Sequence, residues 1–243
     1  MALRGGVLGG VLWYDEFVRR FNATFIAADM YKQFISGLQN TLFITLCATV
    51  IGCTIGSAVA IAKVYHAHTG RIKWVNSLCD LYLTIIRGTP IVLQLLIMYF
   101  VIIPPKYSAL LAAILTFGIN SGAYLAEIIR AGIMAIDIGQ TEASRSLGLS
   151  AAASMRFVIL PQAIKNILPA IGNEFIALLK ETSVVGYITV IDLTRAGNLV
   201  RARTLDPYFS LFFVAGVYLL LVIGITSLLK KLERRLRRND RST

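Results

Sequence analysis

Polar and charged side chains interrupt the apolar stretches of this chain at three places. The first is the sequence Arg-Gly-Thr-Pro at residues 87–90, the second is residues 120–130, and the third is residues 180–192. A charged group within an apolar stretch is stable only where it meets water, a partner of opposite charge or a bound solute. The side chains that could recognise a polar solute in this way are Arg87, Thr89, Asn120, Glu127, Glu181, Thr182, Ser183 and Asp192.

The Arg-Gly-Thr-Pro sequence predicts a break in a helix. Gly88 permits unusual backbone dihedral angles, and Pro90 lacks an amide donor and clashes with the preceding turn. One interpretation is a gate or a contact with solute, because a broken helix can expose its backbone groups to a cavity. The other interpretation is a simple kink, with Arg87 extended toward the surface or paired with Asp80.

The other two places also allow a structural interpretation. Glu127 precedes Arg130 by three residues, so the two side chains can form an ion pair on one helix face, which is the commoner role for this spacing. The charged residues near Glu181, together with Asp192 and Arg195, could bind a charged solute or could be solvated helix ends.

The composition is that of an integral membrane protein with one domain. Of the 243 residues, 56% are hydrophobic and 15% are charged, and the mean hydropathy is +0.70. A net charge of +11 would suit a nucleic-acid-binding protein, but seven of the 24 Lys and Arg residues lie in the tail KKLERRLRRNDRST, directly after an apolar stretch. Such a cluster marks the cytoplasmic side of a membrane span. Cys47, Cys53 and Cys79 are expected to be small core residues, and neither a metal site nor a cleaved signal peptide is expected.

The uncharged stretches predict an all-α fold with about five membrane spans, since a hydrocarbon core of about 30 Å needs roughly 20 helical residues. Four spans are expected within residues 33–62, 74–103, 107–126 (continuing past Glu127) and 207–229. Residues 162–179 are less apolar. An odd total number of spans, together with the resemblance described below, makes them the remaining span. Residues 14–32 mix aromatic and charged side chains, as in an amphipathic segment on the membrane surface, although a poorly ordered leader would have the same composition.

A short polar segment, EASRSLGLSAAASMRFVILP, begins at Glu142 between apolar stretches. Thr141 is expected to cap a helix with Glu142 in its first turn, where the helix dipole favours an acid. Ala143 and Leu147 are four residues apart and would share a face that fits a partner's groove. Gly148 can adopt the left-handed conformation that ends a helix. An ordinary amphipathic loop helix would have the same spacing.

This segment resembles the EAA loop of ATP-binding-cassette (ABC) importer permeases. That loop has the pattern Glu-Ala-Ala, three residues, Gly, nine residues, an aliphatic residue, any residue and Leu-Pro. The matching residues are Glu142, Ala143, Ser144, Gly148, Val158, Leu160 and Pro161, and Ser144 in place of the usual Ala is the one departure. Segments at residues 37–45, 86–95, 121–133 and 160–183 look like the polar amino-acid subfamily of these permeases, so the resemblance covers roughly residues 34–229.

The resemblance implies a type I ABC importer permease fold, with the loop docked as a coupling helix on an ATPase subunit. It also implies a second permease copy or paralogue, a second ATPase subunit and an external solute-binding protein. The chain has no Gly-x-x-x-x-Gly-Lys-Ser/Thr phosphate loop, so we expect the partner ATPase to bind ATP and Mg²⁺ and this chain to bind no cofactor.

Polar amino acids are the cargo that the resemblance implies. Glu181 and Asp192 would suit the cationic side chain of a basic amino acid, because an unpaired acid in a cavity attracts a cation. Glutamine, glutamate and cystine stay open as cargo.

We expect three regions and one orientation in a bacterial plasma membrane. The regions are an external amphipathic segment (residues 1–33), a permease domain (34–229, with the coupling loop at 137–161) and a basic cytoplasmic tail (230–243). Five spans with the tail inside put the N-terminus outside and the loops at residues 63–73 and 137–161 in the cytoplasm. Three arginines, at positions 195, 201 and 203, would then lie outside, against the usual charge bias.

Other classes of protein fit less well. A secondary transporter driven by an ion gradient usually has repeated halves and mid-span carboxylates, whereas this sequence shows no repeat and Glu127 is its only central acid. A non-transporting scaffold has similar spans but leaves the docking loop unexplained. A membrane enzyme lacks support, because His66 and His68 lie in a loop without a nucleophile or metal set nearby.

Overall fold

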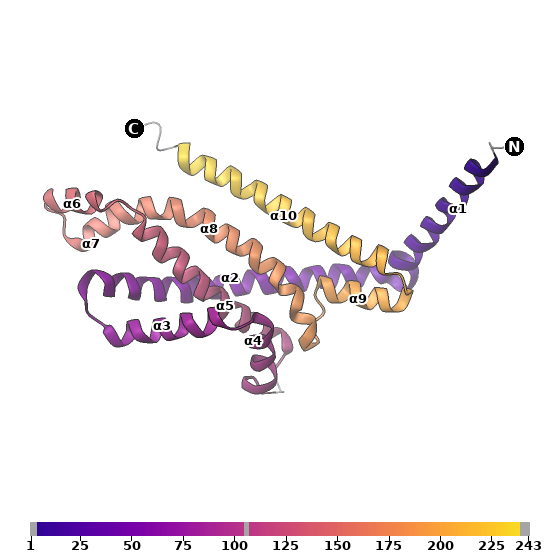
Figure 1. Ribbon diagram of the computed structural model, residues 1–243, viewed down its shortest axis with the longest axis horizontal. Coiled ribbons are helices and arrows are strands. Elements are labelled where there is room, and N and C mark those ends of the chain that lie inside the picture. The colour runs from indigo at the N-terminus through magenta and orange to yellow at the C-terminus, as the bar shows by residue number, and fades with distance from the viewer. Residues whose placement is uncertain (1–3, 105–106, 239–243) are drawn as a thin grey trace.

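The computed structural model describes residues 4–104 and 107–238, and the regular structure within these ranges is helical throughout (Figure 1). In the first half the elements are α1 (Arg4–Phe21), η1 (Asn22–Ile26), η2 (Ala27–Asp29), α2 (Met30–Thr69), α3 (Lys73–Gly88), α4 (Ile91–Ile97) and η3 (Met98–Ile102). In the second half they are α5 (Ala109–Met134), α6 (Ile138–Ser146), α7 (Ala151–Ser154), η4 (Met155–Ile159), α8 (Leu160–Glu181), η5 (Thr182–Ile188), α9 (Leu193–Thr204) and α10 (Pro207–Arg238).

Three helical stretches of the described chain are long and apolar enough to cross a membrane, namely Trp13–Thr69, Ala109–Met134 and Pro207–Arg235. A fourth crossing results if α3 and the stretch Ile91–Ile102, which are bent by 106° at the break between them, count as one span. The break confirms the prediction from the Arg-Gly-Thr-Pro sequence. The less apolar α8 is not among these helices, although its 22 residues, about 33 Å, would reach across the hydrocarbon core.

The first predicted span is longer than its uncharged residues suggested. Helix α2 has 40 residues and continues to Thr69, so the predicted loop at 63–73 is mostly helical and only residues 70–72 join α2 to α3. Residues 63–69 are more polar, and they extend α2 about two helical turns beyond its apolar stretch.

Helix α2 packs closely along α5 because small residues line their contact. A Cβ on Gly56 would lie 2.8 Å from the Cβ of Leu125 and 2.9 Å from the amide nitrogen of Ala126. Small residues of this kind let membrane helices approach each other, as predicted for the segment after Asn120. Buried apolar clusters then join α2 and α5 to α4 and η5 at one level (Ile44, Leu95, Phe117, Val185) and to α8 at another (Ala60, Ile133, Ala163, Ile167).

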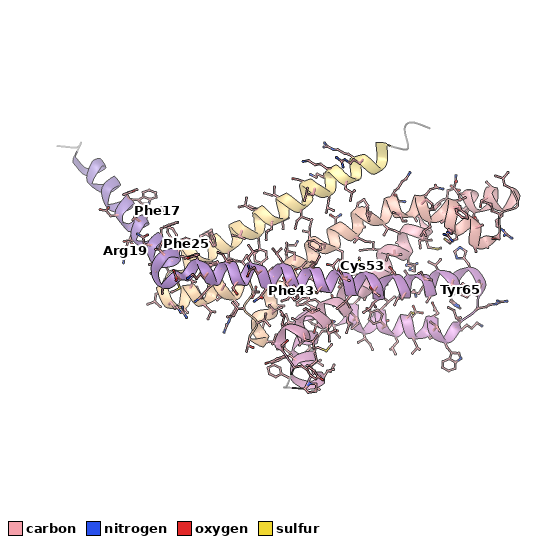
Figure 2. The ribbon with its side chains drawn as sticks, turned by 180° about the vertical axis from the view of Figure 1, so that it is seen from behind. Phe17, Arg19, Phe25, Phe43, Cys53 and Tyr65 are labelled. Atoms are coloured by element: carbon pink, nitrogen blue, oxygen red, sulfur yellow. The ribbon has the colours of Figure 1, made fainter. Side chains whose placement is uncertain are left out.

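Other faces of the long helices are exposed and apolar, as expected for contact with lipid. Phe43 and Tyr65 on α2 are both exposed and can be followed in Figure 2. In the most apolar window of α10 only 6% of the residues are buried within the chain.

Most connecting segments lie at two ends of the molecule, and the part of the chain around α4 projects from the side between them (Figure 1). One end holds α6, α7, the turn between α2 and α3 and the C-terminal end of α10. The other end holds α9 and the junction of α1 with α10. This arrangement sorts the polar loops into two sets on opposite sides of the spans.

Candidate coupling and translocation sites

Helix α6 begins one turn earlier than the sequence predicted. Asp137 is its N-cap, and the side chain accepts a hydrogen bond from the amide of Gly139 at 2.6 Å. The prediction that Thr141 caps this helix was therefore wrong, because an acid four residues earlier satisfies the first amides. Gly148 ends the turn with φ +86°, and its amide bonds to the carbonyl of Arg145 at 3.0 Å, which confirms the predicted left-handed stop.

One face of α6 is open to a partner, and the other is fixed to α7. Glu142 and Ala143 are exposed, and Leu147 is 85% exposed within the chain. Ser144 is buried instead, where its hydroxyl hydrogen-bonds the hydroxyl of Ser154 on α7 and donates to the carbonyl of Thr141 at 2.9 Å. The one departure from the family pattern thus lies inside the loop and holds it together.

The loop is also joined to the start of α8. Leu160 and Pro161 open this helix, where a proline costs no hydrogen bond. The side-chain Nε2 of Gln162 donates to the side-chain oxygen of Gln140 at 3.3 Å and to the backbone carbonyl of Val158 at 2.9 Å. Helix α6 is thus connected to α8 through η4 and through this side-chain contact.

At the break between α3 and α4, Gln94 satisfies the backbone groups that the break exposes. Its Nε2 lies 2.7 Å from the carbonyl oxygen of Ile86, and 3.1 Å and 2.8 Å from the carbonyl and hydroxyl oxygens of Thr89. Its Oε1 accepts a hydrogen bond from Asn120 on α5 at 3.0 Å. Thr89 and Asn120, two predicted pathway residues, are thus brought together by a side chain to which sequence reasoning gave no role.

Arg87 pairs with α5 and not with Asp80. Its guanidinium lies 4.0 Å from Glu127 and stacks over the ring of Tyr124 at 5.6 Å. Asp80 is already bonded to Lys63 on α2 and to Asn76. The suggested pairing of Arg87 with Asp80 was therefore wrong, because Lys63 pairs with Asp80 while Arg87 reaches Glu127 on α5.

Glu127 also forms the predicted ion pair with Arg130. Two bonds, of 2.9 Å and 3.3 Å, join the carboxylate to the guanidinium. Glu127 thus links the helix break, through Arg87, to the C-terminal third of α5. A neighbouring contact that the sequence did not indicate joins Ser121 on α5 to Glu174 on α8 at 3.1 Å.

The third group of polar residues has separate contacts at the end of α8. Thr182 is fully buried and donates to the carbonyl of Leu179 at 2.8 Å, while Glu181 is half-buried. Ser183 lines a cleft of about 290 Å³ with Lys180 and Tyr218. Glu181 and Ser183 are the members of this group that a solute could still reach.

Asp192 has a structural role. It is fully buried, and its two carboxylate oxygens accept bonds from the amides of Thr194 (2.8 Å) and Arg195 (3.1 Å) at the start of α9. A capping carboxylate of this kind is committed to the helix, so we do not retain Asp192 as a cargo contact.

Three features define the class of this protein as a membrane permease. They are apolar helices of membrane-spanning length, a broken helix lined by polar groups, and an exposed short helix of the coupling type. The chain belongs to the family described as the binding-protein-dependent transport system inner membrane component, which matches residues 52–238.

Relatives support this assignment over most of the chain. The arginine transport system permease protein ArtQ of Bacillus subtilis is 39% identical over 85% of this chain and 93% of its own length. The putative glutamine transport system permease protein GlnP of Rickettsia felis is 37% identical over 83% and 92%. A crystal structure of an amino acid ABC transporter with histidines has a chain that is 42% identical, with a TM-score of 0.78 over 84% of this chain and 94% of that one.

A more distant neighbour shows the fold alone. The methionine ABC transporter MetNI in an inward-facing conformation has a chain that is 21% identical, with a TM-score of 0.74 over 87% of this chain and 99% of that one. The fold is therefore that of a type I ABC importer permease. The chain is a permease subunit and not an enzyme, since ATP hydrolysis in these importers belongs to a separate ATPase; neither a secondary transporter nor a scaffold is favoured.

Proposed function

We propose that this chain forms the translocation pathway for polar amino acids in a bacterial plasma membrane and couples that pathway to ATP hydrolysis through α6. The observation that supports coupling is the exposed face of α6, with Glu142, Ala143 and Leu147 open to a partner on a helix held by Ser144. The partners are two ATPase subunits, a second permease copy or paralogue and an external binding protein. The N-terminus lies outside and the basic tail inside.

The mechanism follows from the path that joins α6 to α8, in which α6 packs against α7 and η4 and η4 continues into α8. When ATP closes the two ATPase subunits, the α6 helices of two permeases move together with them. Because α8 packs against α5 and α10, that motion becomes a rigid-body rocking of the spans. The external side then opens to the loaded binding protein, and hydrolysis restores the inward-facing state.

Glu142→Lys tests the coupling. Reversing the charge of an exposed residue in the docking face should uncouple transport while the protein still inserts and assembles. The measurement is ATPase activity and uptake by the purified complex in lipid, screened with single amino acids. Asp15→Lys makes the same change at an exposed site at the other end of the molecule and should leave both activities intact. Normal coupled uptake with Glu142→Lys would contradict the assignment of α6.

The cargo that we favour is a polar amino acid, including basic ones. Two relatives are named as arginine and glutamine permeases, and Glu181 is a half-buried acid at the last residue of α8. If Glu181 contacts a cationic side chain, Glu181→Gln should reduce uptake of arginine or histidine more than uptake of glutamine. Asp29→Asn, which removes an exposed acid paired with Lys32, is the matched control. Equal loss of all cargoes would point to a structural role for Glu181.

A further inference from the structure

Where the N-terminal helix meets α10, two adjoining clefts lie apart from the coupling and translocation residues. The first is polar, has a volume of about 280 Å³, and is lined by Arg19, Arg20, Thr24 and Asp206 among others. Thr24 is fully buried, and its hydroxyl has no hydrogen-bond partner among the described residues. This hydroxyl is closed to the cleft, so the groups that a ligand in the cleft can reach are the charged side chains of Arg19, Arg20 and Asp206.

The second cleft is aromatic and has a volume of about 670 Å³. Phe17, Phe21 and Phe25 form one wall, and Tyr208 with three phenylalanines of α10 forms the other. The walls meet where Phe17 approaches Phe209, with ring centroids 5.3 Å apart. Figure 2 labels Phe17 and Phe25 along this junction, with Arg19 between them in the sequence.

Tyr208 lines both clefts, so the polar and aromatic parts adjoin at this residue. The junction lies where the long apolar stretch of α10 begins at Pro207, which is the level at which lipid headgroups meet a membrane-spanning helix. A ligand that fills both clefts must have a charged end and a long apolar end, which is the chemistry of a phospholipid.

The charges of the polar cleft are balanced. Glu16 bonds to Arg19 at 2.8 Å and to Arg20 at 2.7 Å, and Arg20 lies 3.4 Å from Asp206. Each guanidinium uses two of its five N–H donors in these contacts, which leaves donors for a phosphate. Two guanidiniums matched by two carboxylates suit a zwitterionic headgroup better than a purely anionic one.

We propose that the junction of α1 and α10 binds one phospholipid with a primary ammonium in its headgroup, of the phosphatidylethanolamine class. The phosphate accepts hydrogen bonds from Arg19 and Arg20. The ammonium donates to Asp206 Oδ2, the oxygen that faces Arg20, because Asp206 Oδ1 accepts bonds from the amides of Tyr208 and Phe209 at the start of α10. One acyl chain fills the aromatic cleft. The lipid fixes α1 against the transport domain, to which α1 is otherwise joined by few polar contacts.

The test is native mass spectrometry of the purified, delipidated complex, titrated with phosphatidylethanolamine, phosphatidylcholine and phosphatidylglycerol of matched acyl chains. Phosphatidylcholine has a phosphate but no N–H to donate, and phosphatidylglycerol has no cation. We expect one molecule of phosphatidylethanolamine per permease to bind more tightly than either. Equal binding of the three lipids, or preference for phosphatidylglycerol, would overturn the proposal.

Variants localise the site. Arg19→Gln removes an exposed guanidinium whose described bonds are to Glu16 alone and leaves the Arg20–Asp206 contact in place, so it should weaken phosphatidylethanolamine binding about tenfold without unfolding α1. Phe212→Ala should weaken binding through the aromatic cleft. The controls are Arg71→Gln in the α2–α3 turn and Phe100→Ala on η3, both at exposed positions remote from the junction in the sequence. Unchanged affinity for phosphatidylethanolamine in both test variants would reject the junction as the site.

Discussion

At the residue scale, the amide of Gln94 makes four polar contacts around the break between α3 and α4. They join the last turn of α3, Thr89 and Asn120, so one side chain connects the broken helix to α5. Asn120 is only 4% exposed and would lose this partner if Gln94 were replaced by an apolar residue. Gly88 and Pro90 produce the break, and a single amide joins it to α5.

Gln94→Leu should destabilise the protein by about 1–3 kcal/mol, because it leaves Asn120 and the exposed backbone carbonyls unsatisfied. The expected result is a lower Tm of the purified complex together with slower uptake. Gln39→Leu, at an exposed position on α2, should change neither. Adding Asn120→Leu to Gln94→Leu should recover part of the lost stability, since both partners are then apolar. A Gln94→Leu variant with unchanged Tm and uptake would show that the bend does not need this amide.

At the element scale, the contact between α2 and α5 depends on the short distance between their backbones at Gly56. Gly56→Ala should be destabilising by about 1–3 kcal/mol, because the added methyl meets backbone and Cβ atoms of α5 that cannot rotate away. Gly224→Ala in α10 is the matched control, since a Cβ there meets nothing within 4 Å. The measurement is the Tm of each variant in the same detergent. Equal stability of the two variants would mean that α5 can shift to admit the methyl.

The elements themselves could largely be predicted from the sequence, whereas the contacts between them could not. Apolar stretches of about 20 residues indicate the spans, and Pro90 indicates the break, because both effects act on neighbouring residues. The capping of α9 by Asp192 and the pairing of Arg87 with Glu127 depend on the path of the folded chain. A charged residue in the sequence shows that a partner is needed, but several partners satisfy that need equally well before the helices are packed.

At the scale of the whole molecule, polar segments lie at two ends. Both ends contain basic residues, so the positive charges alone favour opposite orientations in the membrane. The basic cluster that begins at Lys230 in the last turns of α10 favours a cytoplasmic C-terminus, and the turn between α2 and α3 lies at the same end. Helix α9, at the other end, contains Arg195, Arg201 and Arg203. We give the tail more weight, because positive charges next to a span resist transfer across the membrane most strongly, and because α6 must reach an ATPase in the cytoplasm.

This orientation predicts which positions react with a membrane-impermeant maleimide in intact cells. With Cys47, Cys53 and Cys79 replaced by alanine, a single cysteine at the exposed position of Arg201 should be labelled from outside. A single cysteine at the exposed position of Arg71, in the α2–α3 turn, should be labelled only after the membrane is permeabilised. Both single-cysteine variants must retain uptake for the comparison to hold. The opposite labelling pattern would place α9 in the cytoplasm and α6 outside, and would remove α6 from contact with any ATPase. Labelling of both positions in intact cells would contradict the separation of the loops by the membrane.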